Sequence, residues 1–335
     1  MDEIINKRIT MDLSVSYYDD NTRISNSSIG WYLISPIYFF KAMNGEGEKF
    51  EASFLRSGTM IHMYLLQYEE FWKNYRISNA NTPSSAQQKS FAENYVKSKE
   101  KNIKSKALEA YKNSYAVKGK SDDKIQLEAD ELISKIGDYI KELMEKDPRE
   151  RINFYEHSTL KTIEENIKFH KKANTLIYNF NPGDEVYSEF HINWVDEETG
   201  VECKSLIDRL IINHKTKEIK LVDLKTTNKI HDFKSSMIEY GYFRQMAFYK
   251  RAIFWYFKYI LELDPNEYSF QTYIVAISTN DKTKNEIRVF SITDEDKKEY
   301  DKLISNILTK IKWHNTMNYK EGSYDYYNNE GIDIL

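Results

Sequence analysis

The chain has 335 residues, of which 30% are charged and 41% hydrophobic, and its formal net charge is −4. This length can bury a full core in one large domain or two, and the composition suits a soluble globular protein. No apolar run is long enough to cross a bilayer, and the first residues lack the apolar stretch of a signal peptide, so we expect a cytoplasmic protein. The single cysteine, Cys203, excludes an intrachain disulfide and a four-cysteine metal cluster.

The N-terminal part is expected to be helical. Residues 25–40 predict two short helices, the first capped within residues 26–28 and the second capped by Ser35 and followed by Pro36. Residues 56–68 predict a helix that is apolar nearly all round and that carries His62. A lone buried histidine is more often a hydrogen-bonded core residue than a metal ligand, so this helix alone does not assign His62 a function.

Residues 82–146 are polar, charged and helical in period, with a break at residues 118–121 and a stop at Pro148. Lysines crowd residues 97–124 within this stretch. A run of charge is ordinarily a solvated helix face, and a contact with the DNA backbone or with another subunit is the alternative.

Two strand predictions place acidic residues side by side. Residues 186–194 predict a strand that contains Glu189, and residues 201–227 predict a β-hairpin with its turn at residues 213–217. Asp208 lies on the first strand of the hairpin, whereas Asp223 and Lys225 project together from the second, because residues two apart face the same side. Taken alone, Glu189 also fits an exposed strand carboxylate, and an aspartate near a strand end is often a turn residue.

Two carboxylates on paired strands, with a lysine beside them, form a site for a hard divalent cation such as Mg²⁺. The lysine can orient or help deprotonate an attacking water. This combination of groups is the equipment for phosphodiester hydrolysis.

The C-terminal part alternates helix and strand. Residues 233–263 predict a helix on which Gln245 and Tyr249 share one face, within a segment that is also an aromatic core stripe. Residues 268–278 and 285–292 predict a second hairpin, and Thr293 is expected to cap a final helix that ends near residue 317. The tail, residues 321–335, is expected to be loosely ordered.

The segment from Asp208 to Lys225 resembles the PD-(D/E)xK nuclease motif, with Asp208 as the first acid and residues 223–225 as the second half. Residues 57–62 are similar to the G-T-x-x-H motif of RecB-like and exonuclease VIII (RecE)-like nucleases. Glu189 follows in the right order, and residues 242–249 are similar to the Q-x-x-x-Y helix motif of the same group. The resemblance covers about residues 25–249 and is interrupted by the long charged helical stretch. Because several RecB-like nucleases carry a four-cysteine iron–sulfur cluster, the single cysteine excludes that sub-branch.

The resemblance implies an α/β fold with a restriction-endonuclease-like core, in which helices flank a mixed central sheet. It divides the chain into an N-terminal helical part of the core (1–80), a charged helical insertion (81–180), the catalytic core (181–318) and a C-terminal tail (319–335). The implied ligands of Mg²⁺ or Mn²⁺ are the side chains of His62, Glu189, Asp208 and Asp223 and the backbone carbonyl of Leu224.

The resemblance also assigns roles in catalysis. Lys225 would position the attacking water, Gln245 and Tyr249 would orient the DNA strand or the lysine, and two metal ions could act together. The implied activity is 5′→3′ exonuclease digestion of linear double-stranded DNA in phage-type recombination. The implied partners are double-stranded DNA ends, a single-strand annealing protein and further copies of the chain, with no membrane. Another PD-(D/E)xK nuclease, either an endonuclease or an end-processing enzyme, and a DNA-binding scaffold with a vestigial site are the alternatives.

Overall fold

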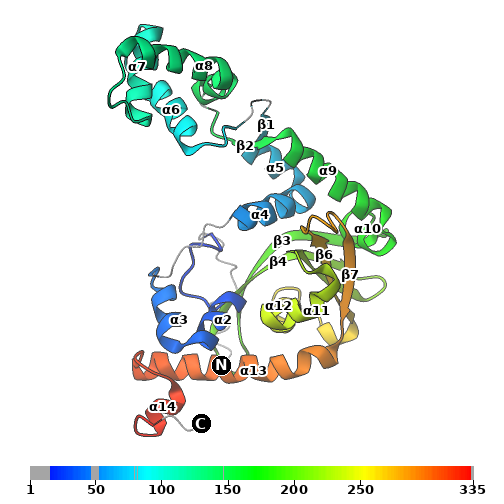
Figure 1. Ribbon diagram of the computed structural model, residues 1–335. Coiled ribbons are helices and arrows are strands. Elements are labelled where there is room, and N and C mark those ends of the chain that lie inside the picture. The colour runs from blue at the N-terminus through cyan, green and yellow to red at the C-terminus, as the bar shows by residue number, and fades with distance from the viewer. Residues whose placement is uncertain (1–15, 47–52, 79, 81, 146, 333–335) are drawn as a thin grey trace. The chain divides into compact units, whose positions relative to one another are not determined.

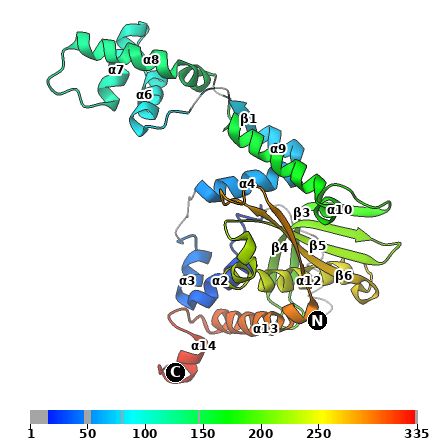
Figure 2. The same ribbon diagram turned by 45° about the vertical axis from the view of Figure 1, so that its right-hand side comes forward.

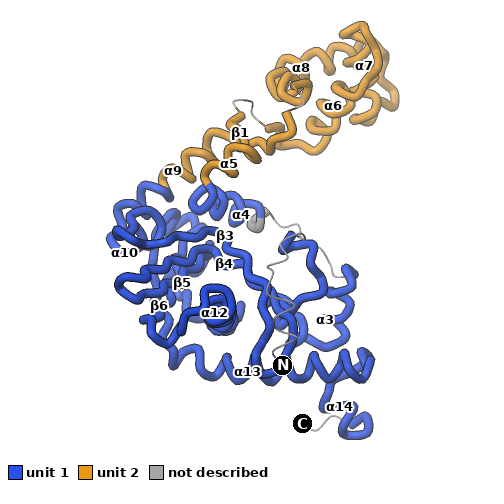
Figure 3. Tube along the Cα trace, turned by 180° about the vertical axis from the view of Figure 1, so that it is seen from behind, with its two compact units in different colours: residues 1–67, 163–335 blue, residues 68–162 orange. Residues whose placement is uncertain are grey.

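The structure is a computed structural model that describes residues 16–46, 53–78, 80, 82–145 and 147–332. The chain divides into two compact units (Figure 3), one formed by residues 1–67 and 163–335 and the other by residues 68–162. Among the described residues, no helix combines the length and the apolar character that a membrane span requires.

The first unit contains a five-stranded mixed sheet of order β3-β4-β5-β6-β7. Its strands are β3 (Asp184–Val195), β4 (Glu202–Asn213), β5 (Glu218–Thr227), β6 (Ser269–Ser278) and β7 (Ile287–Ile292). β5 and β6 are parallel and the other neighbours are antiparallel. Both predicted hairpins and the expected α/β class with a mixed sheet are confirmed.

Helices surround this sheet. They are α2 (Asn26–Ile34), α3 (Pro36–Met43), α4 (Ser53–Leu66), α10 (Lys171–Ile177), α11 (Phe233–Glu239), α12 (Tyr242–Tyr259), α13 (Asp294–Met317) and α14 (Tyr324–Asn328), with the short 3₁₀ turns η1 (Ile230–Asp232) and η2 (Pro265–Glu267). The crossover from β5 to β6 consists of η1, α11, α12 and η2. Figures 1 and 2 show α12 between the sheet and α13, where its buried Met246, Phe248 and Ile253 join the main core.

Most helix ends follow the predicted capping chemistry. Ser35 caps α3 with Pro36 in its first turn, and Thr293 forms a capping box with Asp296 at the start of α13. The cap of α2 is Ser25, one residue before the predicted range, because its hydroxyl accepts the backbone N–H of Ser28.

Two helical expectations are wrong in detail. The helix predicted over residues 233–263 is two helices, because Gly241 adopts the left-handed conformation (φ = 67°) between α11 and α12. The described part of the tail is not loosely ordered throughout, because it forms α14, whose Tyr324 and Tyr327 rings lie 4.9 and 5.1 Å from the Trp313 ring.

The second unit is a helical bundle on a short parallel ladder. Its elements are α5 (Tyr68–Asn74), β1 (Tyr75–Ser78), α6 (Ala86–Lys97), α7 (Ile103–Ser114), α8 (Asp122–Met144) and β2 (Glu150–Asn153), and α9 (Phe154–Phe169) spans the boundary between the units. The unit differs from the predicted insertion at both ends. It begins before residue 81 because β1 pairs with β2, and it ends before residue 180 because α10 packs against β7 of the first unit.

Candidate metal centre

The candidate site lies where the β3–β4 ladder is interrupted by one pair and the β4–β5 ladder ends. In the β3–β4 ladder, Ser188 pairs with Arg209 and Phe190 with Ile207, so that Glu189 and Asp208 face each other without a backbone pairing between them. On the other side of β4, the ladder with β5 ends at the pair Arg209 and Val222. Asp208 therefore lies at a fork in the sheet, and continuing the same register places it opposite Asp223.

The backbone at this fork directs side chains toward one point. Glu189 has φ = 47°, in the left-handed region that residues with a side chain rarely adopt, so the regular alternation of β3 is interrupted there. The backbone N–H of Leu224, at the level where β4 and β5 no longer pair, donates a hydrogen bond of 2.7 Å to Asp208 Oδ2. This bond holds the Asp208 carboxylate between the two strands.

His62 reaches the same point from α4. Its Nδ1 lies 3.6 Å from Asp208 Oδ2, and ligand atoms of His62, Glu189 and Asp208 all lie within 4.8 Å of one another. α4 contacts β4 and β5, and a Cβ added at Gly58 would lie 3.4 Å from Thr226 Oγ1 on β5. The contacts of α4 with β4 and β5 thus bring His62 to the carboxylates, and Gly58 faces Thr226 at a distance where a Cβ would make an ordinary van der Waals contact.

Asp223 and Lys225 form the buried side of the site. Lys225 Nζ lies 2.6 Å from Asp223 Oδ2, and the Asp223 side chain is fully buried. Among the described residues, Asp223 Oδ1 has no partner at all, and Oδ2 has only its ion pair with Lys225. A buried carboxylate with an unpaired oxygen is costly in a folded protein unless a cation completes its coordination.

The acidic groups shift one another's protonation. Burial, reinforced by the charges of Asp208 and Asp223, raises the pKa of Glu189 to about 7. Burial also raises the pKa of Asp208, and it raises the pKa of Asp223 to about 6 against the opposing effect of Lys225. Ionising all of these carboxylates at once is unfavourable, because their negative charges repel one another in a buried site. A bound cation would offset this repulsion.

The pKa values of His62 and Lys225 shift in opposite directions. Burial and the positive charge of Lys225 lower the pKa of His62 to about 4, so its imidazole is neutral near pH 7 and can offer a lone pair to a metal. Burial by itself would lower the pKa of Lys225, but the charges of Asp223 and Asp208 outweigh it and raise that pKa above its usual value. Lys225 is therefore an ammonium group that donates hydrogen bonds.

Gln245 and Tyr249 of α12 lie together as their spacing predicts, with Gln245 Nε2 donating a 2.9 Å hydrogen bond to Tyr249 Oη. Burial and the charge of Asp223 raise the pKa of Tyr249 well above its ordinary value, so this phenol is neutral and near the acidic cluster. No hydrogen bond joins either side chain to Lys225 among the described contacts. Tyr249 thus lies within electrostatic reach of the acidic cluster, whereas the action of both residues on DNA or on the lysine stays a prediction.

The structure adds two tyrosines that the motifs did not single out as site residues. The Tyr242 ring lies 5.0 Å below the ammonium of Lys225, at cation–π distance, and belongs to the segment similar to Q-x-x-x-Y. Tyr18 is largely exposed to solvent, and partial desolvation together with the charges of Glu189 and Asp208 raises its pKa. No spacing signal marks Tyr18, because the contact between residues 16–25 and β4 is long-range in sequence.

The donor set fits a hard divalent cation. Carboxylate oxygens predominate among the donors, and one neutral imidazole is present. The Asp223 oxygen without a hydrogen-bond partner is the observation that favours a bound cation. Soft metals are disfavoured because the single cysteine is buried elsewhere, in the main core beside Trp194. The backbone carbonyl of Leu224 as a ligand stays a prediction.

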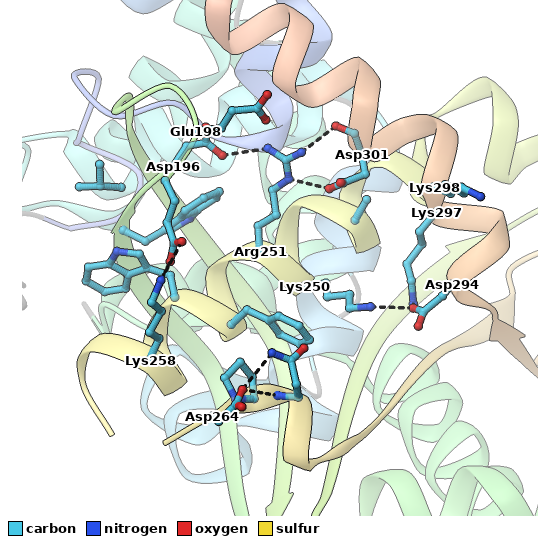
Figure 4. Close-up of a pocket in the computed structure, with 18 of the residues that line it drawn as sticks. Asp196, Glu198, Lys250, Arg251, Lys258, Asp264, Asp294, Lys297, Lys298 and Asp301 are labelled. Atoms are coloured by element: carbon cyan, nitrogen blue, oxygen red, sulfur yellow. Dashed lines mark hydrogen bonds and ion pairs between the residues drawn. The ribbon is translucent and has the colours of Figure 1, made fainter. Parts of the chain in front are cut away.

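A large cavity of the first unit lies elsewhere, between the β3–β4 turn, α12, η2 and α13 (Figure 4), and no predicted site residue lines it. Its charged side chains neutralise one another. Arg251 contacts Asp196 at 2.8 Å and Asp301 at 2.6 Å, and Lys250 contacts Asp294 at 2.9 Å. Because the acidic cluster, and not this cavity, gathers unpaired polar atoms, we assign the chemistry to the cluster.

Comparisons with known proteins add little to this geometry. No protein-family profile and no curated protein matches the chain. A crystal structure described as a "Putative exonuclease" from Eubacterium rectale is similar over 97% of this chain and 94% of its own, with 14% identity and a TM-score of 0.44. At that level of similarity the inference of function rests on the site itself.

Proposed function

We propose that the chain is a metal-dependent deoxyribonuclease that digests linear double-stranded DNA as an exonuclease. The observation that carries the proposal is the fork between β3, β4 and β5, where ligand atoms of His62, Glu189 and Asp208 lie within 4.8 Å of one another. On the neighbouring strand, Lys225 pairs with the buried carboxylate of Asp223. Carboxylates on diverging strands next to a cationic lysine are suited to bind a phosphodiester through a cation and to stabilise the charge that develops during its hydrolysis.

Each residue has a role in this proposal. Asp208, Asp223, Glu189 and His62 would hold Mg²⁺ or Mn²⁺, with the carbonyl of Leu224 as a further oxygen ligand. When bound, the cation would supply Lewis-acid polarisation of the phosphodiester and neutralise the carboxylates.

Lys225 would act on the substrate side. Its raised pKa keeps it protonated, so it would orient the attacking water and donate a hydrogen bond to a phosphoryl oxygen, and it would not serve as the base. The Tyr242 ring beneath the ammonium would help to hold Lys225 in position, and the Gln245–Tyr249 hydrogen bond would fix these two side chains on α12.

The finer parts of the proposal rest on the motifs. The order of the G-T-x-x-H, Glu189, Asp208, D-L-K and Q-x-x-x-Y segments supports a 5′→3′ exonuclease of phage-type recombination. It would act on double-stranded DNA ends, with a single-strand annealing protein as partner. A homo-oligomer that closes around the duplex would let a chain of net charge −4 stay on a polyanionic substrate through many cycles.

The test compares linear duplex, labelled at one 5′ end, with covalently closed circular DNA in Mg²⁺ and in EDTA. We expect release of labelled mononucleotides from linear duplex in Mg²⁺ only, with circular DNA intact. Cleavage of the circle would replace the exonuclease with an endonuclease. Binding of duplex without hydrolysis in either Mg²⁺ or Mn²⁺ would leave a DNA-binding scaffold.

A further inference from the structure

The strongest feature outside the site is a local concentration of positive charge in the second unit. Residues 97–120 contain eight lysines and two glutamates, a net charge of +6, whereas the whole chain has −4 and the remainder therefore has −10. This segment spans the last residue of α6, the α6–α7 turn, α7 and most of the α7–α8 connection.

Three lysines without an ion pair among the described residues lie close together at the α6–α7 turn, whereas the exposed Lys118, which shares this property, lies after α7. Lys97, Lys112 and Lys120 pair with carboxylates at 3.6, 2.6 and 2.5 Å. Lys99, Lys101 and Lys104 are exposed, and none of them has an ion pair within the described part of the chain. Their charges are thus not neutralised within the unit.

The turn that carries these lysines is ordered by its own contacts. The Ser98 hydroxyl is hydrogen-bonded to Glu109, which ties the turn to α7 and occupies that carboxylate. The Asn102 side chain caps α7 by accepting the backbone N–H groups of Lys104 and Ser105 at 2.9 and 3.3 Å. The three ammonium groups are therefore presented from a fixed backbone, at the end of a bundle with a packed core.

We infer that the α6–α7 turn of the second unit, with Lys99, Lys101 and Lys104, is a binding surface for the phosphate backbone of double-stranded DNA. Lysines present point charges to phosphates, and neutralising phosphates releases counterions from the duplex. The inference rests on the proposed function for its choice of a DNA partner, and it adds a second contact with DNA that does not involve the metal centre.

The residue types favour duplex phosphates over bases and over single strands. No arginine occurs between Arg76 and Arg149, so this segment lacks the side chain that most often reads guanine. Single-strand binding needs exposed aromatic rings for stacking, but Tyr95 and Tyr111 are buried, and Tyr115 stacks on Tyr111 at 4.6 Å. The surface would thus hold any duplex sequence.

The test measures binding of a short duplex to the full chain in EDTA, across salt concentrations, with and without the triple substitution K99Q/K101Q/K104Q. Each lost phosphate contact reduces the magnitude of the slope of log K against log salt by about 0.9. The slope of the triple variant should therefore be smaller in magnitude than that of the wild type by about 2.7. Over a fourfold rise in salt, wild-type affinity should then fall roughly 40-fold further than the affinity of the variant.

The matched control removes three exposed lysines that are already paired, K73Q/K141Q/K298Q, whose partners are Glu70, Asp138 and Glu295. Its net charge equals that of the test variant, and we expect its salt slope to match the wild type. Equal slopes for all three proteins, or equal losses in both variants, would overturn the inference. A changed oligomeric state of the test variant with unchanged DNA binding would also overturn it and assign the turn to a protein contact.

Because binding is measured without metal, the two proposals fail separately. A chain that digests linear duplex but shows no effect of the triple substitution keeps its proposed function and loses this surface. A chain that never hydrolyses DNA, but whose salt slope falls by about 2.7 in the variant, keeps the surface and loses the nuclease assignment.

Discussion

Replacing Glu189 by glutamine should stabilise the metal-free protein while abolishing hydrolysis. The folded protein holds the Glu189 proton more tightly than an unfolded chain does, because burial and the charges of Asp208 and Asp223 raise its pKa from 4.5 to about 7. Binding of this proton contributes to the free energy of unfolding. The contribution is fully present below pH 4.5 and is lost as the pH rises through 7. Glutamine stays neutral throughout and mimics the protonated form.

The size of the effect follows from the same shift. The interval from 4.5 to about 7 corresponds to roughly 3 kcal/mol, at about 1.4 kcal/mol for each pH unit. Since Glu189 is partly exposed to solvent, screening reduces this figure, and we expect a gain on the order of 2 kcal/mol above pH 7.

The measurement is urea denaturation of wild type and Glu189→Gln in EDTA from pH 4.5 to 8.5. The free energies of unfolding should nearly coincide at pH 4.5, diverge as the pH rises toward 7, and keep a nearly constant difference above it. Added Mg²⁺ should stabilise the wild type more than the variant, because a cation that binds only the folded protein stabilises it. Glu185→Gln, which removes an exposed carboxylate from the same strand, is the control for the loss of one negative charge. A difference that is constant with pH, or a less stable variant at pH 8, would refute the placement of Glu189 in the field of the two aspartates.

Four further outcomes test the site and the assembly. Asp208→Ala, Asp223→Ala and Lys225→Ala should each lower the rate of duplex digestion by roughly 100-fold or more and keep the native circular dichroism spectrum. A near-normal rate in any of them would remove that residue from the mechanism. His62→Gln should impair cleavage far more than it lowers Tm, and a variant that is unstable but cleaves normally would make His62 a structural residue. Ca²⁺ should support DNA binding with little hydrolysis, because it is larger than Mg²⁺ and less demanding in geometry, and comparable turnover in both ions would contradict this. Light scattering at micromolar concentration should show a trimer or tetramer, and a strict monomer would favour an end-processing enzyme.

Local patterns in the sequence determined much of the fold. Alternation and turn residues located both hairpins, and hydroxyl caps located α3 and α13, because these features depend on residues that are neighbours in the chain. The same locality put Asp223 beside Lys225 and Gln245 beside Tyr249. Residue spacing within one strand or helix was sufficient for these pairs.

Long-range packing decided the rest. Three features depend on segments that are distant in the sequence: the fork that leaves the Asp208 backbone outside both ladders, the left-handed backbone at Glu189, and the contact of α4 with β4 and β5 that places His62. The extent of the second unit was likewise set by the β1–β2 ladder and by the packing of α10 on β7.

Burial and neighbouring charges set the pKa values of the site residues. Burial raises the pKa values of Glu189 and Asp223, whereas the neighbouring charges of Asp223 and Asp208 raise the pKa of Lys225 against the effect of burial. The sequence supplies the charged residues of this site, but only the tertiary structure brings them together where they are partly or fully withdrawn from water.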